Sequence, residues 1–112
     1  MLQPSSYMVK NLQPGESIVK IFVSSKGLLG GSDDVVLTNL RLFGRMQKQS
    51  FSLVGKKIKN LEALPNFKLL GRSNKGSIVV SGPYKLKVTF PSQTLAEDRD
   101  LIIKTLQIDL FK

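Results

Sequence analysis

Residues 77–90 read SIVVSGPYKLKVTF. In the second half of this stretch, apolar and polar side chains alternate strictly: Tyr84, Leu86, Val88 and Phe90 against Lys85, Lys87 and Thr89. Such alternation is typical of a β-strand with one buried face and one wet face. A short β-branched run at residues 77–80 precedes it, and Ser-Gly-Pro at 81–83 supplies a turn. The stretch therefore predicts an antiparallel hairpin with basic residues on its exposed side.

Further short strands are expected upstream, because glycine, proline and asparagine separate several apolar runs there. Their predicted positions are residues 17–24, 35–37, 40–46, 51–54, 58–64 and 67–71. Thr38-Asn39 lies between two of these runs. We expect a tight turn at this point, since asparagine tolerates left-handed backbone.

The segment after Pro91 contains neither glycine nor proline and is predicted to be a helix. Thr94 and Glu97 have the spacing of a capping box, in which each side chain accepts a hydrogen bond from a free backbone N–H. An apolar stripe follows at Leu95, Ile102, Leu106 and Leu110, with Ile103 beside it. A stripe of this kind is far more often a core-packing face than a membrane or partner face.

The 112 residues are enough for one domain with its own core. We expect a loose N-terminal arm at residues 1–11 and a single domain at 12–112. Tyr7, Met8, Val9 and Leu12 can pack back on the core. The predicted fold class is mainly β (α+β), with about seven antiparallel strands capped by one C-terminal amphipathic helix. A strongly bent sheet or partly open barrel would protect the edges of so many short strands.

The chain has no cysteine and no histidine. This composition excludes disulfides, thiol nucleophiles, Ser-His-Asp triads and zinc sites built from Cys or His. Turn chemistry explains the acidic pair Asp33-Asp34, and the dipole of a helix start explains the acidic group Glu97, Asp98 and Asp100. We therefore expect no enzymatic activity, no metal and no cofactor. Apolar runs of four residues or fewer, and no signal-like start, favour a cytoplasmic protein that is free or peripheral to a membrane.

Positive charge is concentrated in the middle of the chain. The net charge is +9, yet residues 35–93 hold eleven basic residues and a single acid, Glu62, which is +10 for that stretch. A field of this sign favours an anionic partner, which is a phospholipid surface, a nucleic acid or an acidic protein face. Simple solubility is the alternative interpretation, because high net charge keeps small domains apart.

Two short motifs resemble a bacterial pleckstrin-homology-like (PH-like) domain and the related GRAM-like domains. These motifs are LQPGE at residues 12–16 and LTNLRL at residues 37–42. Residues 51–61 and the hairpin ending at Phe90 resemble later strands of the same family, so the resemblance covers about residues 12–110. It implies a PH-like barrel that acts as a non-catalytic binding module. Its partner would be an acidic phospholipid surface or a protein, and some members of the family form homo-oligomers.

The resemblance also implies a first candidate site, near the loop at residues 24–32, where headgroup phosphates often bind in PH-like domains. The candidate anion-binding residues are Lys20, Lys26, Arg41 and Arg45. Arg41 has a structural alternative at the barrel mouth, and Asn39 departs from the basic residue of the phosphoinositide pattern. Leu28 and Leu29 in this loop would insert into lipid or contact a partner, unless they fold over the barrel end.

A second candidate site is a basic sheet face. Its residues are Lys56, Lys57, Lys59, Lys85 and Lys87. Alternation would turn Ile58 inward and place its two lysine neighbours outside. A small basic barrel that binds nucleic acid is the alternative function. Alternation places the aromatic residues Tyr84 and Phe90 on the opposite side of their strand from Lys85 and Lys87. This arrangement counts against stacking of nucleic-acid bases on the basic face.

Overall fold

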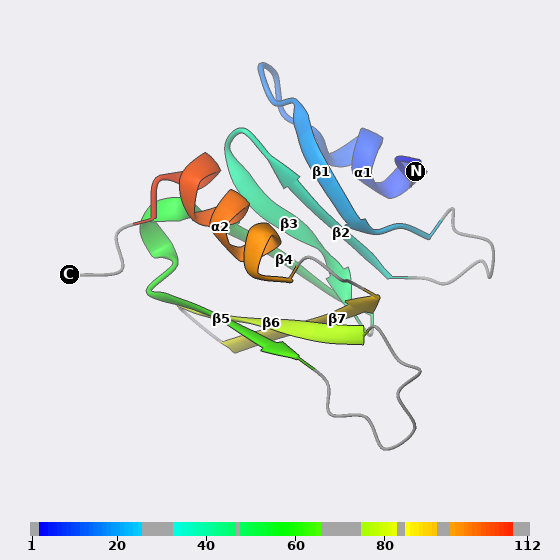
Figure 1. Cartoon of the computed structure of the whole chain (residues 1–112). Helices are drawn as coiled ribbons and strands as arrows, with labels where there is room; N and C mark the ends of the chain where they lie inside the picture. Colours follow the sequence, from blue (N-terminus) through cyan, green and yellow to red (C-terminus); the bar gives the residue numbers. More distant parts are fainter. Residues whose placement is uncertain are drawn as a thin grey trace. The chain divides into compact units, whose positions relative to one another are not determined.

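The computed structural model describes residues 3–25, 33–46, 48–65, 75–82, 85–91 and 95–108. The chain divides into two compact units, Met1–Gly55 and Lys56–Lys112, and each is described by itself. The described residues are mainly β, with two antiparallel sheets and a C-terminal helix (Figure 1). We expected one strongly bent sheet or partly open barrel, but the described strands form two separate sheets and no closed barrel. A single domain over residues 12–112 stays a prediction.

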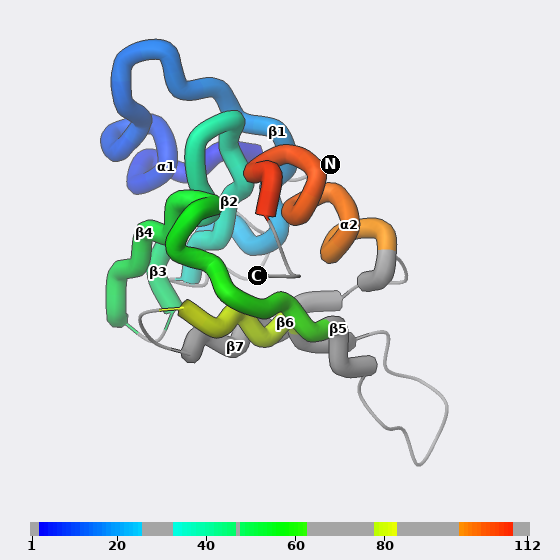
Figure 2. Tube along the Cα trace, turned by 90° about the vertical axis from the view of Figure 1, so that its left-hand side faces the viewer, coloured from blue at the N-terminus to red at the C-terminus, as the bar shows by residue number. Residues whose placement is uncertain are grey.

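The first unit contains a four-stranded antiparallel sheet in the order β1-β2-β3-β4 (Figures 1 and 2). Its strands are β1 Ile18–Val23, β2 Asp34–Thr38, β3 Arg41–Met46 and β4 Gln49–Val54. All four were predicted from the sequence to within two residues at either end. Every residue of β2 is buried, as befits an inner strand with both of its faces covered.

The outer strand β1 carries two irregularities in its pairing with β2. Ile18 and Lys20 face the successive partners Thr38 and Leu37, so Val19 is an extra residue. The same shift recurs between Ile21 and Val23. Such β-bulges bend a strand and increase its twist.

A short helix, α1 Ser6–Asn11, precedes β1 and contacts β2. Residues 1–11 were expected to form a loose arm, and residues 6–11 of this range are helical. The hydroxyl of Ser5 caps α1 by accepting a hydrogen bond from the amide of Met8 at 3.3 Å. The Met8 side chain is fully buried in a cluster with Val36 of β2 and Phe43 of β3. Hydrophobic burial therefore fixes a helix that is too short to be stable alone.

Four residues of the N-terminal segment were expected to pack back on the core: Tyr7, Met8, Val9 and Leu12. Tyr7 joins Met8 against the buried cluster, as does Leu12 just beyond the helix. Val9 does not, since it is 58% exposed. The segment thus packs through one side only.

The second unit contains a three-stranded antiparallel sheet in the order β5-β6-β7, followed by helix α2. The elements are β5 Asn60–Pro65, β6 Lys75–Ser81, β7 Lys85–Pro91 and α2 Leu95–Leu106. They follow the 3-10 turn η1 Gly55–Lys57, which begins at the last residue of the first unit. The predicted hairpin at residues 77–90 is confirmed by the pairing of β6 with β7.

Helix α2 contacts β5 and β6, and the buried residues of this unit include Leu61, Ile78, Val80 and Ile102. The Arg99 Nε donates a hydrogen bond to the Leu61 carbonyl at 2.7 Å and so links α2 to β5. The predicted helix is confirmed, with Ile102 on its buried side. The predicted strand at residues 67–71, the Thr94 cap and Leu110 lie outside the described residues. None of the helices in the described ranges has the length and apolar character needed to cross a bilayer.

Candidate functional site

Glu16 and Arg41 form a buried ion pair in the first unit. Arg41 Nε donates to Glu16 Oε2 at 2.9 Å, and Nη2 donates to Oε1 at 3.0 Å. The Glu16 side chain is fully enclosed, and that of Arg41 is only 11% exposed. Two parallel charge-assisted bonds are the strongest arrangement available to this pair of groups.

The remaining contacts of Arg41 also lie inside the first unit. Nη1 donates to the Ser52 hydroxyl at 2.9 Å, and Nη2 donates to the Asn11 carbonyl at 2.7 Å. The guanidinium carbon lies 4.1 Å from the centre of the Phe43 ring, a cation–π contact. Arg41 was a candidate headgroup ligand with a structural alternative, and these contacts favour the structural role.

The network joins the two motifs on which the family resemblance rests. The Thr38 hydroxyl donates to Glu16 Oε2 at 2.6 Å and accepts from the Arg41 amide at 3.1 Å. Asn39 accepts from the Ser17 amide at 2.8 Å and donates to the Gly15 carbonyl at 3.2 Å. Residues 12–16 and 37–42 therefore act as one hydrogen-bonded unit.

The turn at Asn39 differs from expectation. The non-glycine residues with positive φ in the described ranges are Lys48 and Gln107, so Asn39 is not left-handed. Its side chain bonds to backbone groups of Gly15 and Ser17, just before β1.

Electrostatics in this network keep Glu16 ionised. Burial alone would raise the pKa of Glu16, but hydrogen bonds from Arg41, Thr38 and the Gln13 amide outweigh it and lower the pKa from 4.5 to about 2. The carboxylate is therefore charged at every pH at which the protein is expected to work.

Arg45, another candidate anion ligand, pairs with the buried Asp34. Arg45 Nε donates to Asp34 Oδ2 at 2.8 Å, and its guanidinium lies 4.6 Å from the centre of the Tyr7 ring. Burial would raise the pKa of Asp34, yet hydrogen bonds from the Ser25 amide and from the side chains of Ser5 and Arg45 lower it overall. The Arg45 side chain is 35% exposed, whereas that of Asp34 is fully buried.

The rest of the first candidate site is less complete. The Lys20 ammonium lies 5.7 Å from the centre of the Phe22 ring. Lys26, Leu28 and Leu29 lie outside the described residues. A convergence of these side chains on one anion stays a prediction.

Three residues of the second candidate site are exposed lysines that lie close together in the chain. Lys56, Lys57 and Lys59 are exposed, whereas Ile58 between them is only 3% exposed. This confirms the predicted inward position of Ile58. Lys56 and Lys57 belong to η1, and Lys59 directly precedes β5. The three lysine side chains therefore project from a turn and not from a regular strand. We call Lys56, Lys57 and Lys59 the lysine turn.

Backbone contacts place the lysine turn beside the turn between β6 and β7. The Lys59 amide donates to the Ser81 carbonyl at 2.7 Å, and Ser81 pairs with Lys85 of β7. Lys87 pairs with Val79, which in turn pairs with Glu62 of β5. Lys59 and Lys85 thus lie on opposite sides of Ser81, with β6 between them. A single basic face that includes Lys85 and Lys87 stays a prediction. The hydrogen bond from the Lys59 amide to the Ser81 carbonyl was not predicted from the sequence, because a contact between distant segments leaves no local sequence pattern.

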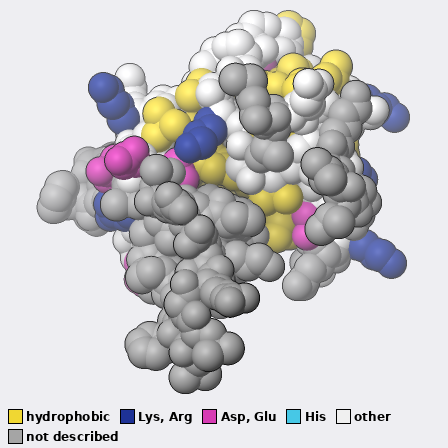
Figure 3. Space-filling view, turned by 45° about the vertical axis from the view of Figure 1, so that its right-hand side comes forward, with side chains coloured by type: hydrophobic (Ala, Val, Ile, Leu, Met, Phe, Trp, Pro, Cys, Tyr) yellow, Lys and Arg dark blue, Asp and Glu magenta, His cyan; other side chains and the backbone are white. Residues whose placement is uncertain are grey.

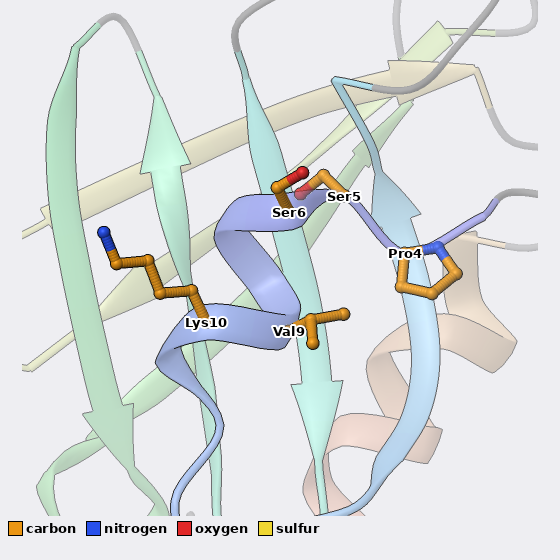
Figure 4. Close-up of a pocket in the computed structure, with 5 residues that line it drawn as sticks. All are labelled: Pro4, Ser5, Ser6, Val9 and Lys10. Atoms are coloured by element: carbon orange, nitrogen blue, oxygen red, sulfur yellow. The ribbon is translucent and has the colours of Figure 1, made fainter.

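Other surface features are less specific. Lysine and arginine side chains project at several places on the face shown in Figure 3, so positive charge is not confined to one cluster. A shallow hollow of about 330 Å³ is lined by Pro4, Ser5, Ser6, Val9 and Lys10. Figure 4 shows Lys10 extending away from the two serines, so these polar groups do not converge. Within the described ranges, no cluster of three or more acidic side chains is placed to hold a metal ion.

Comparison with known proteins gives no match to a family model, to a curated protein or to a solved structure.

Proposed function

We propose that this protein is a non-catalytic PH-like binding module that docks on an acidic phospholipid surface through the lysine turn. The proposed fold is supported by the order of its elements, which is a series of antiparallel strands followed by one C-terminal helix. It is also supported by the network that joins the two resembling motifs through Glu16 and Arg41.

The observation that carries the proposal is the exposure of three lysines around the buried Ile58. The buried isoleucine holds the backbone of the turn, and the ammonium groups on either side stay in water. A lysine near an anionic membrane surface contributes about 1 kcal/mol to binding, which is about fivefold in affinity. Three lysines on one turn are therefore enough for weak, salt-sensitive docking.

A lipid surface fits the lysine turn better than a single-stranded nucleic acid does. Binding of single strands combines phosphate contacts with base stacking on aromatic side chains. Residues 56–62, KKIKNLE, contain no aromatic side chain. The turn therefore offers charge without a stacking platform, which suits a surface of lipid headgroups.

The test is co-sedimentation with vesicles of phosphatidylcholine alone and with phosphatidylserine added, at low and at physiological salt. We expect binding to the phosphatidylserine vesicles only, with weaker binding at higher salt because ions screen exposed charges. Lys57→Gln/Lys59→Gln should lower the affinity about 25-fold, by the same fivefold for each lysine.

The matched control is Lys10→Gln/Lys104→Gln, which removes the same charge from two exposed lysines elsewhere. It should weaken binding much less. Equal losses in the two double variants would show attraction by overall charge and would overturn the assignment to the lysine turn. A wild-type protein that never sediments with phosphatidylserine vesicles would overturn the lipid function itself and favour an acidic protein partner.

A further inference from the structure

Gly82 lies against the backbone of the lysine turn. A Cβ atom built on Gly82 would overlap the carbonyl oxygen of Lys57. It would also lie 3.4 Å from the Lys57 carbonyl carbon and 3.7 Å from the Ile58 Cα. These neighbours are backbone atoms, which cannot swing aside as a flexible side chain can. Any residue larger than glycine therefore has to displace the turn.

Two further contacts hold the same three residues. Ile58 is buried, and the Lys59 amide donates to the Ser81 carbonyl at 2.7 Å. Lys57 thus lies close to Gly82, Ile58 is buried, and Lys59 is hydrogen-bonded to Ser81, so two of these three residues adjoin the turn between β6 and β7. The turn between β6 and β7 acts as a support for the lysine turn.

From this geometry we infer that Gly82 is a positioning residue for anionic lipid binding: it lets the two turns approach closely enough to fix the backbone from which Lys57 and Lys59 project. The inference rests on the proposed function. A backbone that is fixed before docking loses less conformational entropy on binding, so the free-energy cost of binding is smaller. Gly82 itself carries no charge and contributes no contact to the lipid.

The deciding variant is Gly82→Ala, which leaves the net charge unchanged. Its first readout needs no lipid and is the amide hydrogen exchange of Lys59. We expect this exchange to become about tenfold faster, because a Cβ in a filled space destabilises the closed turn locally. Affinity for phosphatidylserine vesicles should fall several-fold, although no lysine has been removed.

Ser81→Ala is the matched control in the same turn, since it retains the carbonyl that accepts from Lys59. It should leave both readouts close to wild type. If circular dichroism shows that Gly82→Ala does not fold, Ile58→Val loosens the turn more gently and should change both readouts in the same direction.

The outcomes separate the two proposals. Unchanged exchange at Lys59 in Gly82→Ala overturns the positioning role, as does faster exchange with undiminished vesicle binding. If the wild type does not bind vesicles while Gly82→Ala still speeds the exchange, the lipid function is wrong and the structural support of the lysine turn by Gly82 stands.

Discussion

The carboxylate of Glu16 accepts two hydrogen bonds from the guanidinium of Arg41, a residue 25 positions further along the chain. The pair is buried and connects the segment before β1 to the first residue of β3. A buried ion pair adds little stability beyond an apolar pair of similar size, but removal of one partner leaves the other charge without compensation.

Substitution of Glu16 should therefore be costly. We expect Glu16→Gln to lower the free energy of unfolding by about 3 kcal/mol, because Arg41 then stays buried and charged. Urea unfolding measures the change. Glu62→Gln is the matched control at an exposed glutamate and should stay within about 0.5 kcal/mol of wild type. A Glu16→Gln variant as stable as this control would contradict the prediction.

Stability should also depend on pH through Glu16. Its pKa is about 2 in the folded protein, below the usual 4.5, so the folded state binds this proton less readily than the unfolded chain does. The stabilisation is fully present above pH 4.5 and is lost as the pH falls from there through 2. It amounts to about 3 kcal/mol. The lowered pKa of Asp34 acts in the same direction.

Urea unfolding between neutral and acidic pH tests this dependence. Wild type should lose stability steeply on acidification, and Glu16→Gln should give a flatter profile with the contribution of Asp34 remaining. Identical slopes for the two proteins would show that Glu16 titrates at its ordinary pKa.

The fold could be predicted from sequence where the pattern is local. Alternation of apolar and polar residues marked β7, and short apolar runs bounded by glycine, proline and asparagine marked the other strands. Helix α1 was missed because six residues are too few to show a helical period. The serine cap before it was the available signal, since Ser5 stands where a helix N-cap residue belongs.

The candidate site was predictable only in part. Strand alternation predicted the buried Ile58 and the exposed Lys57 and Lys59 correctly, although these residues lie on a turn before β5 and Lys56 is exposed as well. The partners of Arg41 were not predictable in this way, because Asn11 and Glu16 reach it through tertiary folding. The sequence offered Arg41 both as a ligand and as a structural residue, and its hydrogen bonds favour the second.

Adjacent residues of α1 should respond very differently to truncation. Met8→Ala should cost about 2–5 kcal/mol of unfolding free energy, because a fully buried side chain leaves a cavity. Val9→Ala should be neutral or slightly stabilising, since Val9 is largely exposed and alanine favours helix. Thermal or urea unfolding of the two variants measures the difference. Equal effects would show that α1 does not pack on the sheet through Met8.

Two glycines with positive φ offer a similar contrast. A Cβ on Gly44 would overlap the Asp34 carbonyl oxygen and lie 3.0 Å from the Val35 Cα, whereas a Cβ on Gly15 would meet no atom within 4 Å. Gly15→Ala should thus cost about 1 kcal/mol from backbone strain alone. Gly44→Ala should cost about 1–3 kcal/mol more because the strands must move apart. Equal midpoints in urea would contradict the close approach at Gly44.

The two bulges of β1 have a consequence for self-association. Within the described residues β1 is an outer strand, and such an edge is a ready template for a strand from another molecule. Here the template is broken twice within six residues, at Val19 and again between Ile21 and Val23. An incoming strand would lose register before it could form a continuous ladder. This edge therefore discourages amyloid-like growth by strand addition.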